Sequence, residues 1–326
     1  MKKSIRTILV VLFILIIVIS MYIVTRGSYL EYKELGEKYL SIYKTNTMYN
    51  YIIMGINFVI TFFIMFFANR GIRKGLKDFF DSEKKEMPKL INKSISLVIA
   101  VISSIVVGIL FTPKVILFAS NVSFEKTDLI FNLDISFYMF VEPLIKMTLS
   151  YIMGIFIFLI VYSIAYYIFV FNRYFDGIDK EELKKSHLVK HILNNIRILS
   201  VIYAIYTLVG TLDIVFGNFI TTSSKLQLTG AGLTDVTVRL VGNIIFAIVI
   251  VVATFLATSN IKKENKKGIL RNILTIPAYM VFMFVIMFGF NILFVSSNKY
   301  DKEKKYIERN ISYTKEAYGI NIEMTL

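Results

Sequence analysis

Long apolar segments alternate with short polar segments along almost the whole chain. The first apolar segment carries no charge between Arg6 and Arg26. A helix needs about 20 mostly apolar residues to cross the hydrocarbon core of a bilayer, and seven segments reach that length. The pattern predicts transmembrane helices at about residues 7–25, 47–69, 94–112, 148–171, 198–217, 240–260 and 272–296. The expected fold is an all-α integral membrane protein, a bundle of about seven transmembrane helices.

Two apolar segments have a second interpretation. Val115–Phe118 is too short to cross a membrane, so it is expected to form part of an interfacial or re-entrant piece. The first segment follows Lys2, Lys3 and Arg6 and could be a cleaved signal peptide. Its apolar run exceeds the usual length of about 7–15 residues, and no A-x-A-like site follows it. We interpret it as an uncleaved membrane anchor.

The distribution of basic residues predicts the orientation. Of the 37 Lys and Arg residues, 22 lie on the side of the N-terminus, nine on the opposite side and six after the last apolar segment. Cytoplasmic loops are enriched in Lys and Arg, so the N-terminus is predicted to be cytoplasmic. After seven crossings the C-terminus is outside. Residues 1–298 then form the membrane domain, and residues 299–326 form an extracytoplasmic tail.

Composition supports a multi-pass membrane protein. Hydrophobic residues make up 56% of the chain, and the mean hydropathy is +0.65. The absence of cysteine excludes disulfides, thiolate catalysis and cysteine-ligated metals. The net charge of +14 lies mainly in the cytoplasmic loops, where each charge attracts anionic lipid by about 1 kcal/mol. The predicted partners are the bilayer and its anionic lipids, not nucleic acid.

Small and amide side chains within the apolar segments predict how the helices pack. Small residues at four-residue spacing let another helix approach closely, as at Ser96, Ala100, Ser104 and Gly108, Ser200 and Ala204, and Ala253 and Ala257. Three intramembrane amides, Asn57, Asn243 and Asn291, are expected to face another helix or a cavity. Interhelical hydrogen bonding is the favoured interpretation. A polar translocation path is the alternative.

Ionisable residues gather near the predicted outer ends of the helices. If these ends meet, they form one outward-facing layer in which Asp213 pairs with Arg239. The alternative, which we favour, places them in the headgroup region, solvated or capping helices. The candidate outer-face polar cluster consists of Asp134, Glu142, Lys146, Asp213, Asp235 and Arg239.

The two histidines are the only pair with metal-ligand spacing. His187 and His191 are four residues apart in the helical-looking stretch 180–195, a spacing that can present two imidazoles to a metal. Neighbouring lysines would repel a cation and no third ligand is apparent, so a basic helix at the membrane surface is favoured. No nucleotide, zinc-protease or hydrolase motif is present. No catalytic, cofactor-binding or metal-binding residue is predicted.

Three stretches beside the predicted helices together resemble a known family. They are Asp128–Phe140 with Pro143, Gly230–Leu240 and Tyr306–Gly319. In this order, and beside these helices, they are similar to uncharacterised protein family 0182, bacterial multi-pass membrane proteins. The candidate tail motif within the third stretch consists of Tyr306, Glu308, Arg309, Asn310 and Tyr318.

The chain departs from the family pattern at several positions. The family tends to have Pro, Leu, His, Pro and Arg where this chain has Leu129, Glu142, Thr237, Lys305 and Lys315. Tryptophans usual in the first outer loop are missing. These differences predict a divergent member.

The resemblance implies a cell-membrane protein whose last helix precedes a large extracytoplasmic region. Because this chain ends at Leu326, it is expected to be the membrane part of such a protein, by natural truncation, a split gene or a deliberate cut. Residues 299–326 would then be the start of a missing outer domain. The resemblance implies no established activity.

Three functions follow, in order of preference. The first is a non-enzymatic module that anchors, or assembles with, an extracytoplasmic domain or partner protein. The second is a transporter or channel whose path is lined by the intramembrane amides. The third is a membrane enzyme that modifies envelope lipids with outer acids such as Asp134 and Asp235.

Overall fold

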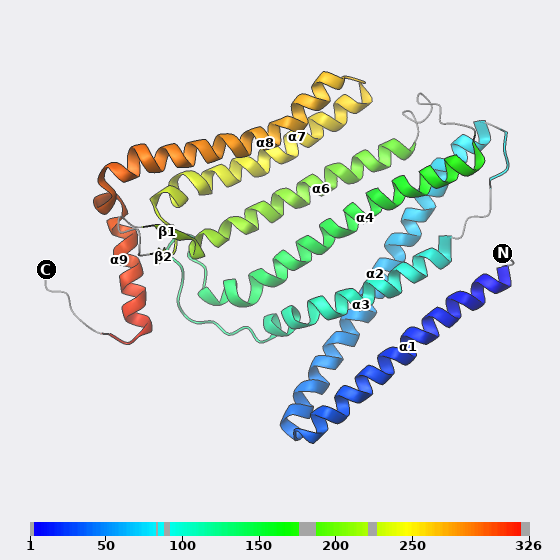
Figure 1. Cartoon of the computed structure of the whole chain (residues 1–326), viewed down its shortest axis with the longest axis horizontal. Helices are drawn as coiled ribbons and strands as arrows, with labels where there is room; N and C mark the ends of the chain where they lie inside the picture. The colour runs from blue at the N-terminus through cyan, green and yellow to red at the C-terminus, as the bar shows by residue number, and fades with distance from the viewer. Residues whose placement is uncertain (1–2, 83, 88–91, 176–186, 221–226, 321–326) are drawn as a thin grey trace. The chain divides into compact units, whose positions relative to one another are not determined.

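The computed structural model describes residues 3–82, 84–87, 92–175, 187–220 and 227–320 (Figure 1). Seven helical segments in this part of the chain are long and apolar enough to cross a membrane. They are Ile8–Glu34, Glu37–Ser82, Lys93–Ala119, Phe137–Tyr174, Val189–Phe216, Asp235–Lys262 and Lys266–Ala317. The prediction of an all-α chain with seven candidate spans is therefore confirmed, apart from one pair of three-residue strands.

The secondary structure consists of long helices with short turns of other helix types at their ends. The α-helices are α1 (Lys3–Glu34), α2 (Glu37–Ser82), α3 (Asn92–Ala119), α4 (Glu142–Tyr174), α6 (His187–Thr211), α7 (Leu240–Lys262), α8 (Lys266–Gly289) and α9 (Lys299–Ala317). Single π-helical turns are η1 (Phe137–Val141), η3 (Asp235–Arg239) and η4 (Phe290–Val295), and 3-10 turns are η2 (Leu212–Phe216) and η5 (Ser296–Asn298). The antiparallel strands are β1 (Asn218–Ile220) and β2 (Gln227–Thr229).

Helix α3 corrects one prediction. It continues through Pro113 to Ala119, so Val115–Phe118 forms its last turn and not a re-entrant piece. Proline removes one backbone hydrogen bond, and membrane helices tolerate this because neighbouring groups satisfy the freed carbonyl. Part of the predicted surface helix at residues 180–195 lies outside the described residues. From His187 onward that stretch belongs to α6.

Most large apolar side chains on these helices are exposed. None of the most apolar stretch of α1 is buried within the protein, and Phe284 and Leu293 are 69% and 80% exposed. A soluble protein buries such surface because contact with water is unfavourable. Lipid tails remove that cost, so exposed apolar helix faces are the expected surface of a membrane protein.

Contacts divide the chain into two compact units. The first comprises Met1–Val122, Ser136–Met147 and Val161–His191, and the second Ser123–Ile135, Thr148–Ile160 and Ile192–Leu326. In the first unit, α2 packs against α3 through the predicted small residues. Ser96 and Ala100 are fully buried and Ser104 is 6% exposed. A Cβ added to Gly108 would lie 2.3 Å from Cγ of Met54, so the close approach of the two helices requires glycine there.

Amide side chains join α2 to its neighbours within the first unit. Asn57 Nδ2 donates to Ser103 Oγ at 3.1 Å, which confirms the interhelical interpretation for this residue. Asn50 donates to Thr112 at 3.1 Å and Asn69 donates to Ser96 at 2.9 Å, while Tyr162 of α4 donates to Asn69 at 2.6 Å. Hydrogen bonds of this kind stabilise helix association where no water competes.

The other two predicted amides are placed differently. Asn291 is exposed in η4, so the prediction that it faces another helix or a cavity is wrong. Asn243 is half-buried near the start of α7. The sequence interpretation missed Asn50 and Asn69, which make the interhelical bonds instead.

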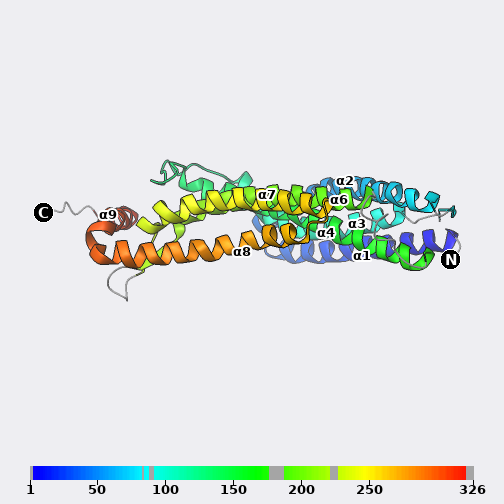
Figure 2. The ribbon, with the colours of Figure 1, turned by 90° about the horizontal axis from the view of Figure 1, so that it is seen from above.

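In the second unit, α7 and α8 lie side by side (Figure 2). Tyr279 donates to the carbonyl of Gly242 at 2.9 Å, and its ring stacks on Phe246 with centroids 5.6 Å apart. The predicted small residues Ala253 and Ala257 are buried on α7. Helix α9 then turns steeply away from the direction of α8 (Figure 1).

The packing of α2 on α3 generates a stability prediction. Gly108→Leu places four extra carbon atoms where Met54 already lies, and overpacking of this kind costs about 1–3 kcal/mol. We expect a clear fall in the thermal unfolding midpoint of the detergent-solubilised protein. Gly55→Leu is the matched control on α2, because nothing lies within 4 Å of a Cβ there. An equal fall in both variants would contradict the predicted role of Gly108.

Candidate functional site

The helix that follows the last apolar segment is the centre of the candidate site. Helix α9 has the sequence KYDKEKKYIERNISYTKEA, which is too rich in charge to lie in hydrocarbon. At its first turn Asn298 donates to the Asp301 carboxylate at 2.6 Å. Further along, Lys304 and Glu308 form an i,i+4 ion pair at 3.8 Å. Below, "the tail joint" means the contacts of Glu303, Arg309 and Glu316 with two loops of the second unit.

Glu303 makes the most buried contact of the tail joint. Its side chain is 4% exposed, and its two oxygens accept from the Leu233 N–H at 3.2 and 3.0 Å. Leu233 begins the helical segment that leads into η3 and α7. The first N–H groups of a helix lack a partner within that helix, and negative charge is favourable near them. Glu303 therefore caps this helical segment from a separate helix.

Burial changes the proton affinity of this carboxyl. Desolvation raises the pKa of Glu303 above its ordinary value, and the hydrogen bond from Leu233 opposes that rise. Lys299 also lowers the pKa, and Asp235 raises it. The pKa is raised overall because a buried carboxylate loses hydration that one backbone donor does not fully replace.

Arg309 makes the second contact of the tail joint. Its Nη2 donates to the carbonyl of Ala231 at 2.9 Å, and its guanidinium lies over the ring of Tyr306 at 5.2 Å. Gly230 adopts φ of +119° beside it, a conformation that residues other than glycine rarely adopt. Arg309 and Gly230 belong to two of the three stretches that carried the family resemblance, and the structure brings these stretches into contact.

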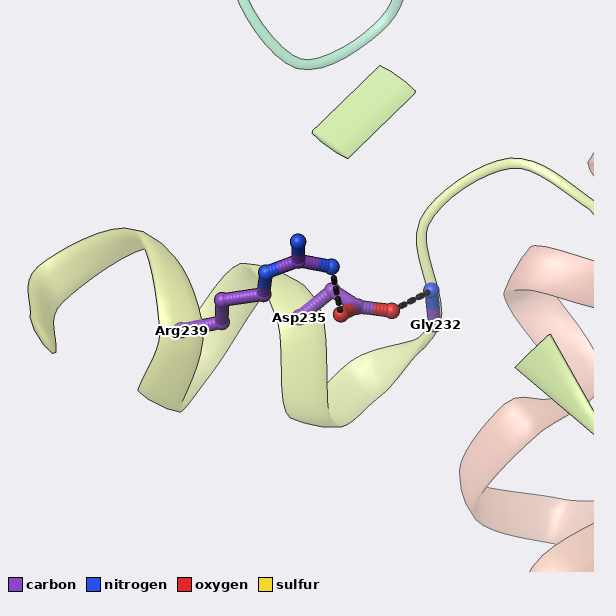
Figure 3. A network of polar contacts seen from close by, with 3 residues as sticks. All are labelled: Gly232, Asp235 and Arg239. Carbon is purple, nitrogen blue, oxygen red and sulfur yellow. Dashed lines mark hydrogen bonds and ion pairs between the residues drawn. The ribbon is translucent and has the colours of Figure 1, made fainter. Parts of the chain in front are cut away.

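Asp235 and Arg239 of η3 make further contacts next to the loop that contains Gly230 and Ala231 (Figure 3). The Asp235 carboxylate accepts from the Gly232 N–H at 3.1 Å and pairs with Arg239 at 3.4 Å. This hydrogen bond is of the kind expected from the capping interpretation of Asp235. Arg239 thus forms an ion pair with Asp235, one helical turn away, and the alternative in which Asp213 pairs with Arg239 stays a prediction.

The third contact of the tail joint reaches the loop at residues 123–135. Lys126 pairs with Glu316 of α9, and Glu316 raises the pKa of Lys126. Within this loop Asp128 is 4% exposed and accepts from the N–H groups of Ile130, Phe131 and Leu133 at 2.8, 2.7 and 2.9 Å. Its carboxylate thereby fixes the turn that follows Lys126.

Asp134 has a similar role at the other end of this loop. It accepts from the Ser123 hydroxyl and from the N–H groups of Phe124 and Glu125. Asp134 also forms an isolated bridge with Thr127. The two carboxylates Asp128 and Asp134 accept hydrogen bonds that hold the loop together.

The remaining members of the predicted cluster are placed separately. Glu142 is 3% exposed and pairs with Lys146 at 3.0 Å in the first turn of α4, within the first unit. Asp213 is exposed in η2 of the second unit. Five of the six residues thus occur in local ion pairs or loop contacts, and the meeting of all six in a single layer stays a prediction.

The predicted tail motif is partly used in the tail joint. Arg309 and Tyr306 contact each other, Asn310 is half-buried, and Glu308 and Tyr318 are exposed. Sequence interpretation missed Glu303, Lys126 and Glu316. The charged pattern of α9 gives no signal that separates Glu303 from Glu308, because both lie among lysines.

In the described part of the chain, two π-helical turns overlap the stretches that carried the resemblance, and a third follows α8. η1 precedes α4, η3 precedes α7 and η4 follows α8. Such wide turns are rare in proteins, and those that do occur are frequently found at functional sites. Sequence patterns do not distinguish them from ordinary helix, so they were not predicted.

The contacts of the tail joint are hydrogen bonds and an ion pair between parts of the chain. Its carboxylates accept from backbone N–H groups or pair with lysine, and its guanidinium donates to a backbone carbonyl. Among the described residues, no group of three or more His, Cys, Asp or Glu is placed to hold a metal ion.

Comparisons with known proteins concern almost the whole chain. The sequence model of the family described as "Uncharacterised protein family (UPF0182)" matches residues 5–325. A UPF0182 protein of Clostridium acetobutylicum is 30% identical over 98% of this chain and 36% of its own length. UPF0182 proteins of Clostridium novyi and Caldicellulosiruptor saccharolyticus are 28% and 24% identical, over 89% and 98% of this chain and 33% and 35% of their own lengths.

The chain spans about a third of the length of these curated relatives. No solved structure matches it significantly.

The tail joint predicts that one buried carboxyl holds α9 in place. Glu303→Ala leaves the Leu233 N–H without its acceptor, and an unpaired buried donor costs about 1–3 kcal/mol. We expect trypsin to cleave at Lys304 and Lys305 about tenfold faster, because cleavage requires local opening of α9. Glu308→Ala, on the exposed side of the same helix, is the control. Equal cleavage of the two variants would show that Glu303 does not hold the helix.

The raised pKa of Glu303 generates a prediction on pH. The folded chain binds this proton more tightly than the unfolded chain, so the contribution to stability is fully present below the ordinary pKa of 4.5. It is lost as pH rises through the raised pKa. Glu303→Gln carries no charge and removes this dependence. We expect the unfolding midpoint of the unmodified protein to fall relative to that of Glu303→Gln as pH rises from 4.5. A difference between the two unfolding midpoints that does not change with pH would refute this prediction.

Proposed function

This chain belongs to the uncharacterised protein family UPF0182, and we propose that it anchors an extracytoplasmic domain or partner protein to the bacterial plasma membrane without catalysing a reaction itself. The observation that carries the proposal is the tail joint. It fixes α9, the polar continuation of the last candidate span, against two loops of the same unit. A helix held in this way presents whatever follows or binds it in a defined direction.

The basic loops support the proposed orientation, with the N-terminus in the cytoplasm and α9 outside. The 22 basic residues assigned to the cytoplasmic side also attract anionic lipid. Because seven crossings place alternate connections on one side, the loop at residues 123–135, the loop before η3 and α9 share the outer side in this arrangement. That shared position is consistent with their contacts in the tail joint.

The intramembrane amides give the transporter alternative less support. Asn50, Asn57 and Asn69 each bond to a hydroxyl of α3, which suits helix packing better than a substrate path. The outer acids favour anchoring over catalysis for a similar reason. Asp134 and Asp235 accept backbone hydrogen bonds, and a carboxylate whose oxygens are engaged in this way serves the local structure.

Cysteine labelling tests the orientation without background, because the chain contains no cysteine. Lys304 on α9 and Lys263 between α7 and α8 are both exposed. With a membrane-impermeant maleimide, we expect Lys304→Cys to react in intact cells and Lys263→Cys to react only after permeabilisation. The reverse pattern would place α9 in the cytoplasm and overturn the proposed anchoring role.

Removal of the tail tests the anchoring itself. We expect deletion of residues 299–326 to abolish co-purification of extracytoplasmic protein cross-linked in intact cells, through a photoreactive group on the membrane domain. The double variant Glu303→Ala, Arg309→Ala should reduce it several-fold, because α9 loses its hydrogen bonds to the backbone of Leu233 and Ala231. Asn57→Leu is the control for a general loss of packing. Undiminished association after the deletion would refute the proposal.

A further inference from the structure

One face of α2 is exposed along most of its length and changes character abruptly. Residues three or four apart share one side of a helix. The exposed residues on this side are first apolar and then basic. In chain order they are Ile56, Val59, Phe63, Phe67, Arg70, Lys74 and Lys77. The change falls between Phe67 and Arg70, at one point on a continuous helix.

Aromatic side chains cover part of the apolar half of this face. Phe63 and Phe67 are 51% and 60% exposed, and their rings stack with centroids 6.4 Å apart. Phe62 and Phe66 meet them edge to face at 5.8 and 5.7 Å. Acyl chains pack well against broad apolar surfaces of this kind.

The basic half begins where the hydrocarbon must end. No charged residue occurs in α2 between Lys44 and Arg70, and charges are costly inside the hydrocarbon. Arg70, Lys74 and Lys77 therefore lie at headgroup depth. At a rise of about 1.5 Å per residue, they lie about 5–15 Å beyond Phe67, where long basic side chains reach phosphate groups.

The opposite side of this segment is packed inside the protein, so the basic side is directed to the surroundings. Ile72, Leu76, Phe79 and Phe80 are between 0% and 6% exposed. Among the side chains that the structure describes, which do not include that of Asp78, no acid forms an ion pair with Arg70, Lys74 or Lys77. Their exposed side chains can therefore reach an anion outside the protein.

We propose that the face of α2 from Phe63 to Lys77 binds an anionic phospholipid. Its acyl chains lie along Phe63 and Phe67, and its headgroup phosphate is held by Arg70, Lys74 and Lys77. Three exposed cations on one helix face select a headgroup with net negative charge over a zwitterionic one. The proposal requires only that α2 crosses a membrane, and it depends neither on α9 nor on which side of the membrane is cytoplasmic.

The absence of tryptophan from the chain allows a direct test. A single reporter is introduced at the proposed site by Phe67→Trp, and at a control position on α8 by Phe284→Trp, where the native side chain is 69% exposed. The full chain is reconstituted in phosphatidylcholine with increasing fractions of brominated phosphatidylglycerol of matched chain length. Quenching reports which lipid occupies the surface beside each reporter.

We expect phosphatidylglycerol to compete about tenfold better than phosphatidylcholine beside the Phe67→Trp reporter, and about equally beside the Phe284→Trp reporter. Arg70→Gln, Lys74→Gln and Lys77→Gln together should remove the difference between the two positions. The matched control replaces Lys262, Lys263 and Lys266, exposed basic residues beside α7 and α8, with Gln. It should leave the selectivity at Phe67→Trp within about twofold, because the site is formed by α2.

Two results would overturn the proposal. Equal selectivity at the two reporters would show only general attraction of anionic lipid to the protein, and this comparison needs no charge variant to fold. An equal loss of selectivity with the control substitutions would show that the net charge of the basic side, and not the face of α2, attracts the lipid. Either result would leave the anchoring role of α9 unaffected.

Discussion

Hydrocarbon offers no hydrogen-bond partner, and this constraint underlies the whole structure. Every backbone N–H and C=O within the bilayer must be satisfied inside the chain, which helices achieve locally. The same constraint applies to side chains. Asn57 and Asn69 therefore bond hydroxyls on α3, and the small residues from Ser96 to Gly108 let the two helices approach closely enough for those bonds.

Outside the hydrocarbon, charged side chains make hydrogen bonds to backbone groups. Asp128, Asp134 and Asp235 each accept backbone N–H groups of their own loops. Glu303 and Arg309 make the same kind of contact between α9 and a distant loop. Burial strengthens such contacts, but a carboxyl deprived of water also holds its proton more tightly, as Glu303 does. The tail joint thus includes a carboxyl whose pKa is raised by burial.

The two surfaces we single out lie in different units of the protein. The tail joint belongs to the second unit, and the lipid-facing side of α2 belongs to the first. One concerns how the chain presents its polar tail, and the other concerns which lipid surrounds it. Both depend on the same physical boundary, where an apolar helix face gives way to charged residues able to reach water or phosphate.

The sequence by itself determined the number and type of the candidate spanning helices, because the length and hydropathy of a segment decide whether it is stable in hydrocarbon. It also identified the small-residue seams, since four-residue spacing places side chains on one side of a helix. The π-helical turns, the continuation of α3 beyond Pro113 and the exposure of Asn291 required the tertiary structure. So did the role of Glu303, whose neighbours in sequence resemble those of Glu308. Contacts between residues 70 positions apart depend on how helices meet, and local pattern carries no information about that.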